Sequence, residues 1–223
     1  MSKAIRTFSN DEQLVAERRQ QIVHCAIEVF MKKGVDEATT ADIAAELGWS
    51  KGLLYHYVST KEDVFYLIAN DQAEGTKRGF SRCQDECALL TPVEGVLHYI
   101  DYYYHVVDRS QNYQVFLNQL AARLPRQDRK TLFDADRFAL DVLDEIIKRG
   151  VKAGDFEVES TMLMAHNIML LGRVWADRRW FLQKHFHLEY YLKVEKDVIL
   201  RMLGVKPHVM PGTGLQASEE GTG

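Results

Sequence analysis

Three hydrogen-bonding side chains, Lys51, Tyr55 and His56, follow closely on one another in a stretch that has helical apolar spacing. On the exposed side of a helix, such donors can reach the phosphates or base edges of nucleic acid. Gly52 would let the backbone approach a duplex closely, and Ser50 would place a helix N-terminus where a phosphate is favoured. An ordinary helical hairpin with a solvated lysine and half-buried tyrosines has the same spacing. The spacing alone does not separate these two interpretations.

Two short helices and the start of a third must position these donors. Each helix has a start signal, and the first also has a glycine stop. The signals are Thr39 with Asp42, Gly48 as the stop, Ser50, and Thr60 with Asp63. Two helices joined by a short turn that contains glycine are the layout of a helix-turn-helix DNA-binding motif.

The stretch TTADIAAELGWSKGLLYHYVSTKEDV closely resembles the DNA-binding signature of the tetracycline-repressor (TetR) family of bacterial transcription regulators. The resemblance extends from about Arg18 to Ile68. The matching positions are Thr39, Ile43, Ala44, Gly48, Ser50, Gly52, Leu54, Tyr55, Tyr57, Lys61 and Glu62. Trp49, Val58 and Thr60 depart from the usual pattern, and Leu53 stands where a small or polar residue often touches DNA.

The resemblance implies an all-α fold, with an N-terminal three-helix DNA-binding domain and a larger helical domain for ligand binding and dimerisation. We place the DNA-binding domain at residues 11–60, the effector and dimerisation domain at 61–204, and a disordered tail at 205–223. The residues expected to contact DNA are Thr39, Thr40, Ser50, Lys51, Gly52, Leu53, Tyr55, His56, Tyr57 and Lys61. Two copies would bind a near-palindromic operator in double-stranded DNA.

The composition of the chain bears on how it binds DNA and on its location in the cell. Lys and Arg number 28 against 32 Asp and Glu, so the formal net charge of −4 predicts a local basic face and a shallow salt dependence. Three cysteines and no secretory signal favour the cytoplasm. Cys83 and Cys87 share a helix face, but no neighbour at a recognised spacing completes a metal set, so we expect no metal and no cofactor. No apolar run approaches the ~20 residues of a membrane span.

The remaining chain reads as further helices. They are expected at Lys61 to about Glu86, Thr91 to about Arg109, Gln111–Arg123, about Arg126–Ala153, Val158 to about His185, and Leu188–Leu203. The helix from Lys61 is the covalent path from the DNA-binding domain to the residues downstream. We assign the last two helices to a homodimer interface, because the helix from Val158 is apolar on more than one side.

Polar aromatic residues are unusually dense in the helix that ends near Arg109, and polar residues interrupt the apolar helix after Val158. Together they favour an effector pocket for a largely apolar molecule, such as a fatty acyl-CoA or an aromatic compound. The candidate contacts are Tyr99, Tyr103, His166, Asn167, Leu170 and Arg173. Partly exposed tyrosines that keep their hydroxyls in water are an equal alternative.

Three functions therefore remain. The leading one is a ligand-controlled transcriptional regulator, and a repressor is favoured over an activator. The second is a DNA-binding regulator without a small ligand, either constitutive or controlled by a partner. The third, an enzyme or lipid carrier, is the weakest, because no phosphate loop and no G-x-S-x-G nucleophile motif is present. We therefore expect no catalysis.

Overall fold

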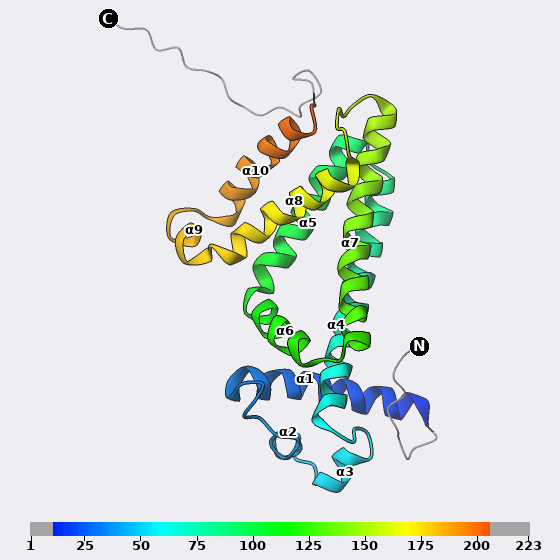
Figure 1. Cartoon of the computed structure of the whole chain (residues 1–223), viewed down its shortest axis with the longest axis vertical. Coiled ribbons are helices and arrows are strands. Elements are labelled where there is room, and N and C mark those ends of the chain that lie inside the picture. The colour runs from blue at the N-terminus through cyan, green and yellow to red at the C-terminus, as the bar shows by residue number, and fades with distance from the viewer. Residues whose placement is uncertain (1–10, 206–223) are drawn as a thin grey trace, which may run out of the picture. The chain divides into compact units, whose positions relative to one another are not determined.

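The computed structural model describes residues 11–205, which form ten helices and no strand (Figure 1). The all-α fold class is therefore confirmed. The helices are α1 (Glu12–Lys33), α2 (Thr40–Glu46), α3 (Lys51–Tyr55), α4 (Lys61–Ala88), α5 (Pro92–Arg109), α6 (Gln111–Arg123), α7 (Arg126–Ala153), α8 (Thr161–Asp177), α9 (Arg179–His185) and α10 (Leu188–Met202).

The predicted helix starts are present as hydrogen-bonded caps. At α2, the backbone N–H of Asp42 donates to Thr39 Oγ1 over 3.2 Å, and the N–H of Thr39 donates to Asp42 Oδ2 over 2.8 Å. The same reciprocal pair joins Thr60 and Asp63 at the start of α4, over 3.1 and 3.0 Å. Each box satisfies N–H groups that a helix end leaves without an intrahelical partner.

The long helix expected from Val158 to His185 is wrong, because the chain breaks at Arg178 into α8 and α9. The Trp175 indole N–H donates to Asp108 Oδ1 over 2.6 Å, and the Gln183 amide lies 3.5 Å from the same oxygen. A straight helix would separate these two residues by about 12 Å along its axis. The break brings both side chains to one carboxylate.

The chain divides into two compact units. Unit 1 comprises the residues up to Arg82 with Arg109–Ala139, and unit 2 comprises Cys83–Asp108 with the residues from Leu140 onward. The backbone therefore passes between the units three times, within α4, near the end of α5 and within α7. These units are defined by packing and differ from the functional domains expected from the sequence. The expected boundary at residue 60, between the DNA-binding and effector domains, remains a prediction.

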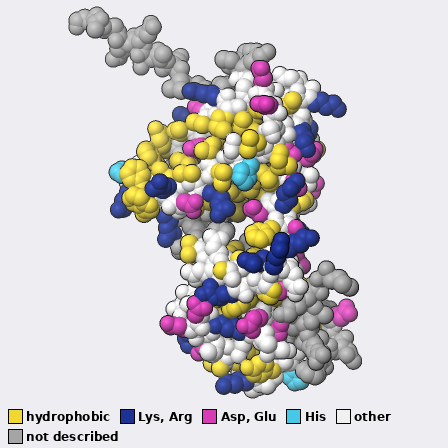
Figure 2. Space-filling model, in the orientation of Figure 1, with side chains coloured by type: hydrophobic (Ala, Val, Ile, Leu, Met, Phe, Trp, Pro, Cys, Tyr) yellow, Lys and Arg dark blue, Asp and Glu magenta, His cyan; other side chains and the backbone are white. Residues whose placement is uncertain are grey.

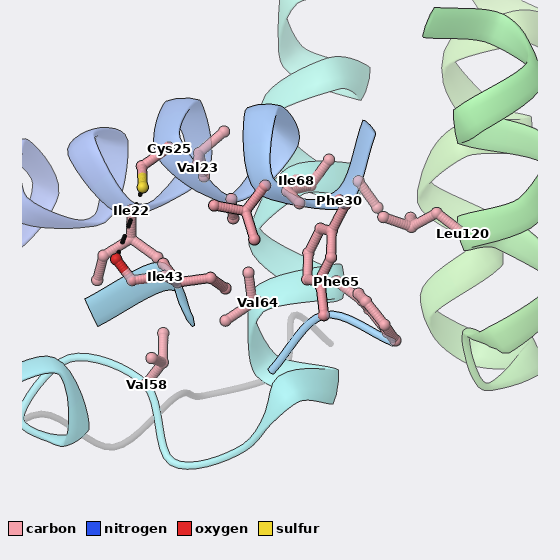
Figure 3. Packing of buried hydrophobic residues seen from close by; sticks show 14 of the residues in the cluster. Ile22, Val23, Cys25, Phe30, Ile43, Val58, Val64, Phe65, Ile68 and Leu120 are labelled. Atoms are coloured by element: carbon pink, nitrogen blue, oxygen red, sulfur yellow. Dashed lines mark hydrogen bonds between the residues drawn. The ribbon is translucent and has the colours of Figure 1, made fainter. Parts of the chain in front are cut away.

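The core of unit 1 joins the three N-terminal helices to α4 and α6 (Figure 3). Phe30 of α1 lies with its ring centroid 5.3 Å from that of Phe65 and 6.3 Å from that of Phe116. Arg123 of α6 makes a two-pronged contact with the Asp36 carboxylate, with its Nε donating over 2.7 Å. Each fully buried large apolar side chain contributes about 1.5–3 kcal/mol. Helix α6 is therefore part of the unit that carries the helix-turn-helix.

The core of unit 2 contains tyrosines where leucine would be usual. Tyr99 and Tyr104 of α5 have no exposed surface, and the Tyr99 and Tyr103 rings stack 6.1 Å apart. Gly172 of α8 faces this layer, and a Cβ built on it would lie 2.7 Å from Tyr103 Cε1. The absence of a side chain at this glycine allows α8 to approach α5 closely.

No helix within residues 11–205 is long and apolar enough to span a bilayer. The predicted tail lies outside the described residues apart from Val205. That residue is 5% exposed, and its N–H donates to Leu200 O over 3.0 Å, so Val205 packs as part of unit 2.

Candidate nucleic-acid interface

The turn between α2 and α3 is tight because Gly48 has a left-handed backbone, with φ +67°. The N–H of Gly48 donates to Ala45 O over 3.1 Å, and that of Trp49 donates to Ala44 O over 2.8 Å. Ser50 then caps α3, with its Oγ accepting from the N–H of Leu53 over 3.1 Å. These bonds fix the direction in which α3 leaves the turn.

One side of α3 holds the helix in the core and the other is open. Leu54 is fully buried, whereas Lys51, Gly52 and His56 are exposed. Leu53 is 38% exposed and Tyr55 is 44% exposed. The predicted donors and the glycine therefore share the open side, as a recognition helix requires.

A hydrogen bond joins the two helices across this open side. The Thr40 hydroxyl of α2 lies 3.1 Å from the Tyr55 hydroxyl of α3. The contact holds the Tyr55 ring in place, and each hydroxyl keeps capacity for a further bond. Thr40 and Tyr55 can therefore present their oxygens together.

Thr39 and Asp42 have a positioning role. The Lys33 ammonium lies 2.7 Å from Asp42 Oδ1 and, together with two bonds from Thr39, holds the pKa of Asp42 well below its usual range. The carboxylate stays ionised and paired. Its charge at the start of α2 is thus offset by Lys33, which reduces its repulsion of a phosphate.

Two residues expected at the DNA surface are engaged elsewhere. Tyr57 is 7% exposed, and its ring centroid lies 5.9 Å from that of Trp49. The Lys61 ammonium donates to Asp36 O over 3.0 Å and lies 5.7 Å from the Phe65 ring. Tyr57 therefore acts mainly as packing, and Lys61 ties the start of α4 to the loop before α2. Nothing in the sequence indicated the contact between Lys61 and Asp36, which are 25 residues apart.

The structure does not bring the six expected effector residues together. Tyr99 and Tyr103 are buried on α5, and the Tyr103 hydroxyl donates to Met169 O over 3.1 Å. The other four residues, all exposed, lie on the outer side of α8: His166, Asn167, Leu170 and Arg173. In the single chain these four side chains therefore do not line a site together with Tyr99 and Tyr103. The inner side of α8 consists of Ala165, Ile168, Met169, Gly172 and Trp175.

Sequence reasoning missed a polar pair inside unit 2. Tyr104 Oη and Glu195 Oε2 are buried and have no hydrogen-bond partner. Burial raises the pKa of Glu195, which opposes ionisation, while a bond to Tyr191 acts the other way. Burial likewise raises the pKa of Tyr104. Tyr104 belongs to the dense tyrosine run, but no local pattern marks Glu195, which lies on another helix.

A surface hollow and a cysteine–histidine cluster are two further features of the described residues. An open hollow is lined by Pro125, Arg126, Gln127, Lys130 and Phe133, and none of the expected effector residues belongs to it. Cys83, Cys87 and His98 form a set whose ligand atoms all lie within 4.8 Å of one another. The spacing along the sequence showed no third ligand for Cys83 and Cys87, and the packing of α5 against α4 places His98 beside them.

The capped helix pair, the glycine turn and the open side of α3 define a helix-turn-helix DNA-binding protein. Comparisons with known proteins agree. The profile of the bacterial regulatory proteins of the tetR family matches residues 22–66. The HTH-type transcriptional regulator HbdR of Aromatoleum sp. (strain CIB) is 28% identical over 200 residues, covering 89% of this chain and 85% of that protein. The chain belongs to the TetR family of transcriptional regulators.

Solved structures show the same fold. A regulatory protein of the tetR family from Rhodococcus RHA1 matches with a TM-score of 0.69 at 24% identity, over 84% of this chain and 97% of the other. The regulator FadR from Bacillus subtilis, solved in complex with stearoyl-CoA, matches with a TM-score of 0.62 at 16% identity, over 81% and 97% of the two chains. These likenesses support an N-terminal helix-turn-helix domain followed by a helical domain.

Proposed function

We propose that this regulator represses transcription as a cytoplasmic homodimer on a near-palindromic operator and that a small, largely apolar effector releases it. The open side of α3 carries this proposal. Lys51, Gly52, Tyr55 and His56 are exposed there while Leu54 anchors the helix. In a dimer, two such helices enter successive major grooves about 34–36 Å apart.

The outer sides of α8 and α10 support the homodimer. Leu163, Leu170 and Val174 recur on one side of α8 and are 59%, 47% and 41% exposed. On α10 the corresponding exposed residues are Tyr190, Val194 and Val198, at 57%, 42% and 40%. Figure 2 shows hydrophobic side chains gathered over this part of unit 2. Exposed apolar surface of this kind marks an interaction site.

The outer residues of α8 fit this interface better than an effector pocket. His166, Asn167 and Arg173 lie among the exposed apolar residues of the same helix side. Between two protomers they would form the polar part of the contact, where hydrogen bonds fix the register. We therefore propose that these three residues contact the partner protomer and not the effector.

For the effector we propose a site at Tyr104 and Glu195. Unpartnered buried polar atoms call for a partner, and a ligand can supply it. Burial raises the pKa of Glu195, and the same apolar surroundings disfavour a free carboxylate on the ligand. An uncharged polar group, such as a thioester carbonyl on an apolar chain, fits better. The bound stearoyl-CoA of the structural relative FadR is consistent with this class.

Substitutions on α3 test the DNA-binding proposal. A Cβ at Gly52 would meet only Ser50 Oγ at 3.9 Å, so Gly52→Ala should fold normally. It should nevertheless weaken binding to an operator selected from random DNA, because the added methyl group separates backbone and duplex. Lys51→Ala should weaken binding and lower the salt slope by about one. Lys32→Ala, an equally exposed lysine on α1, is the matched control. If Gly52→Ala and Lys51→Ala both bind like wild type, α3 is not the recognition helix.

A further inference from the structure

Cys83 and Cys87 lie one helical turn apart near the end of α4, and both are 1% exposed. Their Sγ atoms are 3.9 Å apart. Two thiolates that bind one tetrahedral Zn²⁺ at about 2.3 Å each lie about 3.8 Å apart. The two sulfur atoms therefore have the spacing of a zinc site without any change of backbone.

The third ligand comes from α5. A ring nitrogen of His98 lies within 4.8 Å of both sulfur atoms. The approach of the two helices depends on Gly95, where a Cβ would lie 3.2 Å from Ile146 Cγ2 and 3.8 Å from Cys87 Cβ. Cys87 Sγ also lies 3.4 Å from Gly95 O. The glycine thus brings the His98 helix against the cysteine helix.

The surroundings hold these ligands in place. Glu86 Oε2 lies 2.7 Å from His98 Nε2, which is the carboxylate–histidine contact that orients a metal-bound imidazole. Arg149 donates to Cys87 O over 3.1 Å and to Leu90 O over 2.6 Å, which fixes the end of α4. The side chains of His98 and Glu86 are 39% and 49% exposed, so an ion can enter from their side.

We propose that Cys83, Cys87 and His98 bind a thiophilic divalent cation of the Zn²⁺ class, with Glu86 as the residue that positions His98. Two thiolates and an imidazole select such an ion over Mg²⁺ or Ca²⁺, which prefer oxygen ligands. Three protein ligands leave the fourth tetrahedral position for water or a small anion. The ion would join α4 to α5 within unit 2, and none of its ligands belongs to the DNA or effector site proposed above.

Cobalt titration tests the site. Full-length protein, stripped of metal by a chelator and kept reduced without oxygen, should bind one Co²⁺ per chain. The bound ion should show thiolate-to-cobalt charge-transfer absorption and the intense visible bands of tetrahedral Co²⁺, and Zn²⁺ should displace it. Cys83→Ser, Cys87→Ser and His98→Ala should each abolish this spectrum. Glu86→Gln should keep the spectrum and weaken binding by about 10–100-fold.

Cys25→Ala is the matched control, because Cys25 belongs to unit 1, where its Sγ contacts Ile43 O at 3.6 Å. Its spectrum and affinity should equal those of wild type. Far-UV circular dichroism confirms that each variant is folded, and the half-exposed His98 is the position least able to disturb the core. Absence of the charge-transfer band in wild type overturns the proposal. So does a band that persists in folded His98→Ala, or thiol titration that finds Cys83 and Cys87 joined as a disulfide in freshly purified protein.

Discussion

Gly172 is a position where one added methyl group should destabilise the packing of α8 on α5. A Cβ there would lie 2.7 Å from Tyr103 Cε1 and 2.8 Å from Tyr104 Cε2. Carbon atoms in contact normally lie about 3.5–4.0 Å apart, so both rings would have to move. Neither moves easily, because Tyr103 donates to Met169 O over 3.1 Å and Tyr104 is fully buried.

The size of the effect follows from two opposing terms. Overpacking a core costs about 1–3 kcal/mol, and replacing glycine by alanine within a helix returns about 0.5–1 kcal/mol. Gly172→Ala should therefore lower the free energy of unfolding by up to about 2.5 kcal/mol. For a chain of this size the melting temperature should fall by up to about 10 °C.

Substitution of Gly75 measures the gain from replacing glycine by alanine in a helix without any overpacking. Gly75 in α4 is exposed, and a Cβ there would meet only Arg78 Nη2 at 3.9 Å. Gly75→Ala should therefore raise stability by about 0.5–1 kcal/mol. Urea unfolding monitored by circular dichroism compares the two variants with wild type. If Gly172→Ala is as stable as Gly75→Ala, then the close approach of α8 to α5 does not depend on the glycine.

Three further predictions concern unit 2. Val174→Asp should convert dimers to monomers in analytical ultracentrifugation, whereas Val151→Asp, 38% exposed on α7, should not; a monomeric wild type at micromolar concentration would contradict the dimer. The raised pKa of Glu195 gives stability that is complete below the unfolded value of about 4.3 and is lost as pH rises through the folded value. Glu195→Gln should therefore be more stable than wild type at pH 8 and show a flatter dependence of urea midpoint on pH. Tyr104→Phe should keep stability and operator affinity but weaken release of the operator by an acyl-CoA such as stearoyl-CoA. Tyr103→Phe should lose about 1 kcal/mol of stability and release the operator normally. The reverse pattern would assign the effector contact to Tyr103.

The sequence by itself determined the DNA-binding motif and most of the helices, with the exception of the break between α8 and α9. Capping boxes such as Thr39 with Asp42, the glycine turn at Gly48 and apolar spacing act within a few residues, so their outcome does not depend on distant parts of the chain. The helices α6 and α7 have the bounds that the sequence predicted. The open side of α3 follows from the same short-range pattern.

Only the tertiary structure decided which side chains from different helices meet. His166 and Arg173 interrupt an apolar helix, and a sequence cannot tell whether such residues face the core or the outer surface of a chain that has two apolar sides. Trp175 of α8 and Gln183 of α9 both reach Asp108, which belongs to α5 and lies far from them in the sequence. The meeting of His98 with two cysteines and the burial of Tyr104 and Glu195 are set by how closely helices pack. Those distances depend on side-chain volumes at many positions, among them the missing side chains of Gly95 and Gly172.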